Sequence, residues 1–174
     1  MYDFMDHFLS SVKTVFELRD FKIAGKLDMQ KSFYFAKELG LPIYFKFRWG
    51  KLGPFSNELS YALSVITNKG FISYNGNYEY EEKNFRHVKY LELNKNVNKF
   101  FNELNDYAEK NSVDEIFFIE TLASMHFLHK YSNIPSKEGV ISKLGELKTD
   151  RVSMLSPYYD SSWKLLQKHG MVYS

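Results

Sequence analysis

The sequence predicts a mainly α-helical α+β fold: a winged helix-turn-helix with a small β-hairpin wing, followed by an α-helical subdomain. Three observations predict it. A basic, aromatic segment at residues 43–48 runs into a Gly53-Pro54 turn. A helical pattern then covers residues 57–69, between an N-capping serine and a C-terminal glycine. Two short aromatic runs follow around Asn75-Gly76, a dipeptide typical of tight hairpin turns.

The elements around this segment follow from the spacing of apolar residues. Helical spacing over residues 2–19 and 28–39 predicts two helices before the basic segment, and Asp28 is expected to cap the second. Residues 43–48 alternate between apolar and polar side chains, which predicts a strand. Residues 87–93 predict another short strand.

The second half of the chain has a helical pattern. Helices are expected over 97–110, over 112–129 from a capping box that opens at Ser112, over 135–150 and over 157–169. We therefore expect a winged-helix-like domain at 1–93 and a helical C-terminal subdomain, packed on it, at 94–174. The helix end at His169-Gly170 repeats the one at Lys69-Gly70, so a second, degenerate helix-turn-helix is an alternative to a plain helical subdomain.

Composition excludes several classes of protein. The 174 residues contain no cysteine, which excludes disulfides and thiolate zinc sites. No run of about 18 apolar residues is present, so no membrane span is expected. Asp3 and Asp6 give the N-terminus the wrong charge for a signal peptide. These features predict a cytoplasmic protein without a membrane partner.

Positive charge gathers in the N-terminal half, although the formal net charge is only +2. Residues 13–51 contain nine Lys and Arg against four Asp and Glu, a surplus typical of phosphate contact. Double-stranded DNA is therefore one expected partner. The expected contacts are the basic residues of the strand and turn, the outward side of the helix 57–69 and the tip of the wing: Lys46, Arg48, Lys51, Ser56, Asn57, Ser60, Tyr61, Ser64, Asn75 and Asn77.

Two functions fit this pattern. The first is a DNA-binding transcriptional regulator of winged-helix type, for which a homodimer would suit a palindromic site. The second is a non-enzymatic protein-interaction module, antitoxin-like or defence-counteracting, that binds a protein partner through exposed aromatic residues. The second is kept because the helix 57–69 carries Glu58 and no basic residue before Lys69, and because 18% of the chain is aromatic.

Catalytic and metal-binding motifs are missing from the sequence. No GxSxG, P-loop or GxGxxG pattern occurs. His126 and His129 are three residues apart on one predicted helix and could share a metal, but no HExxH pattern or third histidine follows nearby. We expect no enzyme activity, no catalytic residue, no metal and no cofactor.

Several short motifs together resemble the YwgA-like winged-helix proteins, and are broadly similar to Panacea antitoxin-like domains. They are Lys26-Leu27-Asp28-Met29-Gln30-Lys31, Gly53-Pro54-Phe55-Ser56-Asn57-Glu58-Leu59, Gly70-Phe71-Ile72 and two C-terminal segments, 120–128 and 165–172. The resemblance implies a winged helix with a helical C-terminal half and a regulatory role, and it transfers no catalytic residue. Ser32 departs from the apolar residue expected after the Gln-Lys pair. We expect Gln30 to satisfy backbone groups of a turn.

Overall fold

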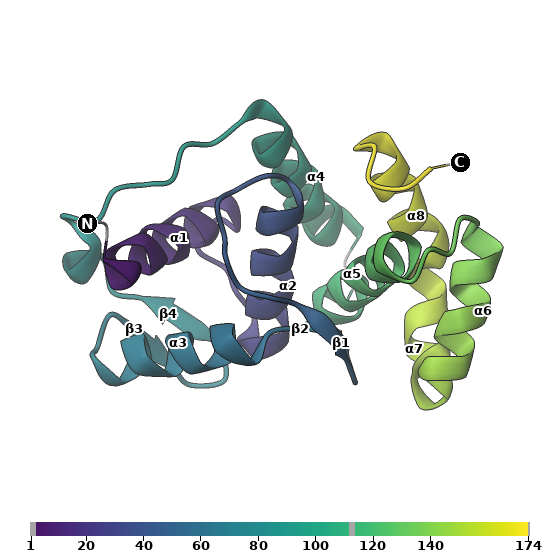
Figure 1. Ribbon diagram of the computed structural model, residues 1–174, viewed down its shortest axis with the longest axis horizontal. Coiled ribbons are helices and arrows are strands. Elements are labelled where there is room, and N and C mark those ends of the chain that lie inside the picture. Colours follow the sequence, from purple (N-terminus) through teal and green to yellow (C-terminus); the bar gives the residue numbers. More distant parts are fainter. Residues whose placement is uncertain (1–2, 112–113, 174) are drawn as a thin grey trace.

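A computed structural model describes residues 3–111 and 114–173. The described chain is mainly helical and carries two small antiparallel hairpins (Figure 1). In chain order its elements are α1 (Phe4–Leu18), α2 (Gly25–Glu38), β1 (Arg48–Gly50), β2 (Gly53–Phe55), α3 (Asn57–Asn68), β3 (Ile72–Tyr74), β4 (Tyr78–Tyr80), the 3₁₀ turn η1 (Glu82–Phe85), α4 (Lys95–Asn111), α5 (Glu115–Tyr131), α6 (Lys137–Leu147), η2 (Thr149–Arg151), α7 (Val152–Leu155), η3 (Ser156–Tyr158) and α8 (Tyr159–Lys168).

Both ends of α3 are fixed as the sequence predicted. The Ser56 hydroxyl accepts the N–H of Leu59 and caps α3, while Gly70 takes a left-handed φ of 78° after it. The prediction for Asp28 is wrong, because α2 already begins at Gly25. Asp114 caps α5. The predicted capping box at Ser112 lies outside the described residues.

The two hairpins bracket α3 in the sequence. In the first, Arg48 of β1 lies opposite Phe55 of β2. In the second, Ile72 of β3 lies opposite Tyr80 of β4, and Ile23, from the link between α1 and α2, forms an isolated bridge to Tyr78. The β3–β4 hairpin is therefore tied to the chain between the first two helices.

Two predicted strands are extended segments without strand partners, because side chains bind their backbone groups. Within residues 43–47, the Lys37 ammonium donates to the carbonyl of Phe45, and pairing starts only at Arg48. Residues 87–93 run along α1, where the Lys13 ammonium donates to the carbonyl of Val88 and the Leu91 N–H donates to Thr14. The strand predicted over 43–48 is wrong for residues 43–47 and begins only at Arg48, and the strand predicted over 87–93 is wrong: in both segments a lysine from a helix binds a backbone carbonyl.

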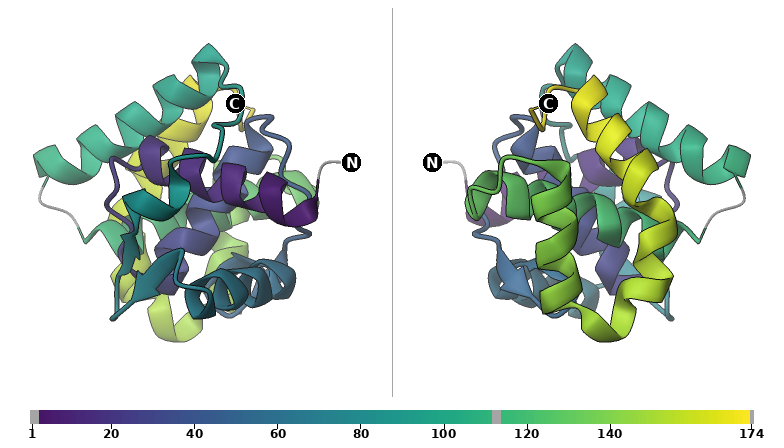
Figure 2. Two further views of the ribbon diagram at one scale, coloured as in Figure 1. Left: turned by 90° about the vertical axis from the view of Figure 1, so that its left-hand side faces the viewer. Right: turned by 90° about the vertical axis from the view of Figure 1, so that its right-hand side faces the viewer.

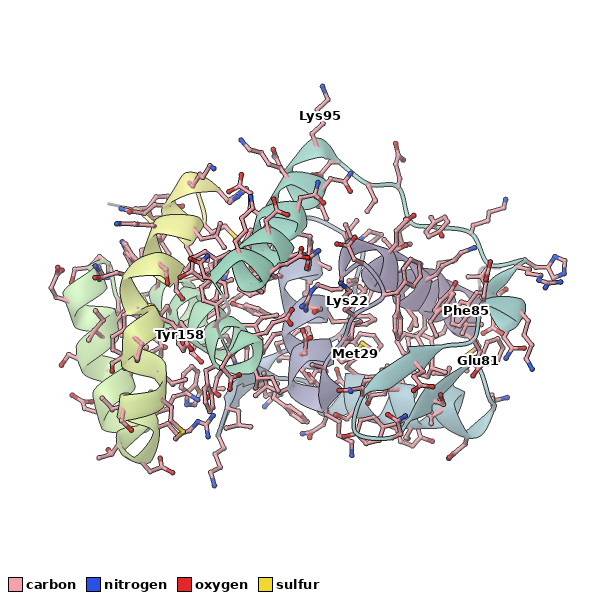
Figure 3. All side chains as sticks on the ribbon, turned by 180° about the vertical axis from the view of Figure 1, so that it is seen from behind. Lys22, Met29, Glu81, Phe85, Lys95 and Tyr158 are labelled. Carbon is pink, nitrogen blue, oxygen red and sulfur yellow. The ribbon has the colours of Figure 1, made fainter. Side chains whose placement is uncertain are left out.

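Helix α5 lies at the centre of the structure. Its residues 118–126 are all buried, which is typical of a helix covered on every side. It packs against α2 and β2 on one side and against α6 and α8 on the other. Figure 2 shows α1 and α3 on one side of the molecule and α6, α7 and α8 on the opposite side. Residues from both halves of the chain thus share one hydrophobic core, in which Met29 of α2 is fully buried (Figure 3).

A buried ion cluster joins α1, α2 and α5. The Arg19 guanidinium is 1% exposed and binds the Asp28 carboxylate, the Ser32 hydroxyl at 2.7 Å and the Glu115 carboxylate at 2.5 Å. Asn105 of α4 accepts a further hydrogen bond from it. Ser32 is polar at this buried position because its hydroxyl accepts from Arg19 and donates to Asp28. Within residues 3–111 and 114–173, no helix is both long and apolar enough to cross a membrane.

Candidate recognition face and a histidine cavity

Helix α3 has one buried side and one uncovered side. Leu59, Ala62, Leu63 and Ile66 are buried, as the helical spacing predicted. The opposite side exposes Asn57, Tyr61, Ser64 and Asn68, with Tyr61 74% exposed. We call this side the α3 face; it is polar apart from the Tyr61 ring.

Two of the predicted site residues, Ser56 just before α3 and Ser60 within it, have structural roles. Ser56 is buried and caps α3. Ser60 is half-buried, and its hydroxyl accepts a hydrogen bond from the Gln30 amide at 2.9 Å. The Ser56 hydroxyl is taken up by the cap, whereas the Ser60 hydroxyl keeps its own hydrogen to donate. Asn57, Tyr61 and Ser64 are exposed, so they can reach a partner.

Two of the three predicted basic contacts, Lys46 and Arg48, lie near the N-terminal end of α3. Lys46, Arg48 and Lys51 are all exposed. The Lys46 backbone N–H donates to the Glu58 carboxylate at 3.1 Å, which places this segment beside the first turn of α3. Lys51 lies in the turn between β1 and β2. An acidic side chain, Glu58, therefore lies next to the basic residues.

The β3–β4 hairpin follows the C-terminal end of α3. Asn75 and Asn77 are exposed at its turn. The Asn75 side chain donates to Glu79 at 2.8 Å and accepts the N–H of Asn77 at 3.2 Å, so these groups shape the turn. Glu79 is also exposed, which adds negative charge to this hairpin.

The turn that leads into α3 is bound by consecutive residues of α2. The Gln30 side chain donates to the carbonyl of Ser56 and accepts its N–H, both at 2.9 Å. The Lys31 ammonium donates to the carbonyl of Pro54 at 2.7 Å. The prediction that Gln30 satisfies backbone groups before this helix is confirmed: both groups belong to Ser56, which connects β2 to α3.

A second buried ion cluster lies beneath the β1–β2 hairpin. Glu120 of α5 is fully buried and binds Lys148 at 2.8 Å and Arg151 at 2.5 Å. The Lys148 ammonium also donates to the carbonyl of Lys51 at 2.8 Å, which ties the hairpin to the C-terminal half of the chain. This cluster was not predicted from the sequence. The one signal was a single acidic residue within an otherwise apolar stretch of α5.

Lys31 belongs to the same cluster but forms no ion pair with a carboxylate of residues 3–111 or 114–173. It is 1% exposed, and burial, together with the charge of Lys148, lowers its pKa to about 7, against the attraction of Glu120. Gly53, with a φ of 91°, packs against this region. A Cβ at Gly53 would lie 2.4 Å from the Ser124 hydroxyl, so only glycine fits there.

A cavity of about 700 Å³ lies at the other end of α2 and α5. Its walls come from the ends of α2, α5 and α8 and from the start of α4, and they include three histidines, His126, His129 and His169. Both ring nitrogens of His129 are engaged, one with the carbonyl of Ile134 at 2.9 Å and the other with the N–H of Tyr173 at 3.3 Å. His126 and His129 therefore cannot share a metal in this arrangement. In the described part of the chain, no group of three or more acidic or histidine side chains is placed to bind a metal ion.

The chain is similar to the uncharacterized protein YwgA of Bacillus subtilis (strain 168). The two are 28% identical over 122 residues, which is 68% of this chain and 68% of that protein. No family model matches the chain, and no solved structure matches it. The similarity supports a YwgA-like protein, in agreement with the motifs quoted from the sequence.

Proposed function

We propose that this protein is a DNA-binding regulator of winged-helix type that inserts α3 into a major groove. The observation that carries the proposal is the uncovered α3 face, which has exposed basic residues at its N-terminal end and the β3–β4 hairpin after its C-terminal end. The bridge between Ile23 and Tyr78 adds support. The bridge pairs the segment between α1 and α2 with β4. This pairing is expected of a winged helix in which β3–β4 is the wing.

The chemistry of the face suits such contacts. The side chain of Asn57 can pair with adenine, and Ser64 can bind either kind of base edge. Lys46 and Arg48 can bind phosphates next to the N-terminus of α3, where the helix dipole also favours negative charge. Glu58 reduces this attraction locally, so we expect affinity to depend strongly on the basic residues.

The test is a titration of fluorescent duplex DNA at about 50 mM and about 200 mM salt. Binding should weaken steeply with salt and should be lost in the variant Lys46→Glu/Arg48→Glu/Lys51→Glu. The matched control is Lys95→Glu/Lys99→Glu/Lys164→Glu, which makes the same charge change at exposed positions of α4 and α8. Equal losses in the two variants would mean nonspecific attraction, and no binding at low salt would contradict the proposal.

A second candidate is a protein-interaction module. Tyr61 is 74% exposed on the α3 face, and exposed tyrosines are common energetic centres of protein interfaces. A pull-down with the native protein beside Tyr61→Ala distinguishes this case. A partner that is recovered by the native protein at high salt and lost with Tyr61→Ala would favour it over DNA binding.

A further inference from the structure

The histidine cavity is separate from the α3 face. Its volume of about 700 Å³ is within the range of small-molecule sites, and its walls combine few apolar groups with several polar ones. The polar side chains that matter are His126 and Lys130 of α5, Glu38 of α2, Asn96 of α4 and Asn133 after α5.

The protonation of His126 follows from its buried neighbour. Tyr34 is fully buried, and its hydroxyl lies 2.6 Å from Nδ1 of His126, its one hydrogen-bond partner within residues 3–111 and 114–173. A buried hydroxyl hydrogen without an acceptor is costly, so the phenol donates and Nδ1 accepts. The proton of the neutral ring is then on Nε2. Burial lowers the pKa of His126 to about 4 and raises that of Tyr34, so both are neutral near pH 7.

The carboxylate in the cavity is already neutralised. Glu38, whose side chain is 4% exposed, accepts from Lys130 at 2.6 Å and from the Tyr131 hydroxyl at 2.5 Å. Lys130 is half-exposed, and two of its three N–H groups are still available to donate a hydrogen bond. His129 has no free ring nitrogen. Two unused groups of the cavity can only donate, Nε2–H of His126 and the Lys130 ammonium, while the amides of Asn96 and Asn133 can donate or accept.

We propose that this cavity binds a small oxyanion, a carboxylate or phosphate group, through Nε2–H of His126 and the Lys130 ammonium. The two donors come from one helix, four residues apart, so they lie on the same side of α5. Because Glu38 balances the charge of Lys130, the site adds no net positive charge, which suits a singly charged group and favours a carboxylate over a doubly charged phosphate. This inference does not depend on DNA binding.

The test uses acetate and inorganic phosphate as probes on the ¹⁵N-labelled protein, with sodium chloride at matched ionic strength as the blank. Long-range ¹H–¹⁵N spectra of the imidazole rings report the tautomer of His126 directly. We expect the Nε2–H form, and saturable shifts of His126 with acetate that chloride does not produce. Saturation by phosphate instead would support the site and identify phosphate as the group that it prefers.

The matched variants are Lys130→Met and Lys143→Met. Both lysines are about half-exposed and paired with a glutamate, but Lys143 is on α6, away from the cavity. Lys130→Met should weaken probe binding by about tenfold or more, because the charged donor is lost and Glu38 is left in the cavity without its cation, and Lys143→Met should not change it. The amide spectrum of each variant shows whether it folds. An Nδ1–H tautomer, no saturation by either probe, or equal effects of the two variants would overturn the proposal.

Discussion

Two buried ion clusters connect the N-terminal helices to α5, and their charges are balanced in opposite ways. In the Arg19 cluster one cation faces two carboxylates, and one of these, Glu115, is 36% exposed. In the Glu120 cluster one fully buried carboxylate faces Lys148 and Arg151, with Lys31 close by. The first cluster can lose a carboxylate and keep its cation paired. The second cannot.

This difference matters for the α3 face because the Glu120 cluster supports the turn that leads into α3. Lys31 binds Pro54 and Lys148 binds Lys51, both through backbone carbonyls of the β1–β2 hairpin. The Arg19 cluster contacts no residue of that hairpin among its hydrogen bonds in the described chain. Perturbing the Glu120 cluster should therefore disturb the hairpin, and perturbing the Arg19 cluster should spare it.

The largest expected effect is that of Glu120→Gln. Without this carboxylate, the buried Lys148 loses its partner, so the free energy of unfolding should fall by about 3–5 kcal/mol. Glu115→Gln is the matched control. It should cost about 1 kcal/mol or less, because Glu115 is partly exposed and Arg19 keeps Asp28. Urea denaturation measures both, and equal losses would contradict the asymmetry.

The next effect is the dependence of stability on pH. Lys31 has a pKa of about 7 in the folded protein and an ordinary value of 10.5 in the unfolded chain. Between about pH 7 and pH 10 the unfolded chain binds one more proton, so stability should rise with pH, by at most about 1.4 kcal/mol per pH unit. Below about pH 7 Lys31 is protonated in both the folded and the unfolded chain, so it no longer makes stability depend on pH.

Lys31→Met separates this contribution from other titrations, because methionine is apolar and of similar length. The variant should have a flatter rise of stability between about pH 7 and pH 9 than the native protein. Some slope should remain, since burial also lowers the pKa of Lys148. An unchanged slope would mean that Lys31 does not titrate in this range.

A smaller effect is expected for Gln30→Ala. The change removes both hydrogen bonds to the Ser56 backbone and leaves buried groups unpaired, at a cost of about 1–3 kcal/mol. Hydrogen exchange at the Ser56 amide should speed up. Gln167→Ala, at an exposed position of α8, is the control and should change neither quantity.

The smallest effect is expected for Ser56→Ala, which removes the N-cap of α3. The expected loss is about 1 kcal/mol, typical of a single capping hydroxyl. Thr149→Ala is a control of similar chemistry, because its exposed hydroxyl bonds only to helix carbonyls of α6. A loss for Ser56→Ala no larger than that of the control would mean that Gln30 and Lys31 alone fix the turn.

Local chemistry made part of this fold predictable from the sequence. Apolar spacing and caps predicted the buried side of α3 and its ends at Ser56 and Gly70, and the role of Gln30 was also predicted. Partners distant in the sequence could not be predicted. Lys148 lies 28 residues from Glu120, and Glu115 lies 96 residues from Arg19.

The wrong strands and the missed cavity depend on contacts between elements, which a pattern within one segment does not contain. Residues 43–47 and 87–93 have strand-like patterns, yet lysines of α2 and α1 bind their carbonyls. The cavity forms where the ends of several helices meet, and no single stretch of sequence carries that pattern. DNA binding remains a proposal that rests on the α3 face.

The most direct test of that proposal is to map duplex DNA onto the protein by amide chemical shifts at low salt. We expect the largest changes at residues 46–51, on the exposed side of α3 and at the turn of the β3–β4 hairpin, and we expect them to shrink as salt is raised. Changes confined to the C-terminal helices, or none at low salt, would contradict the account.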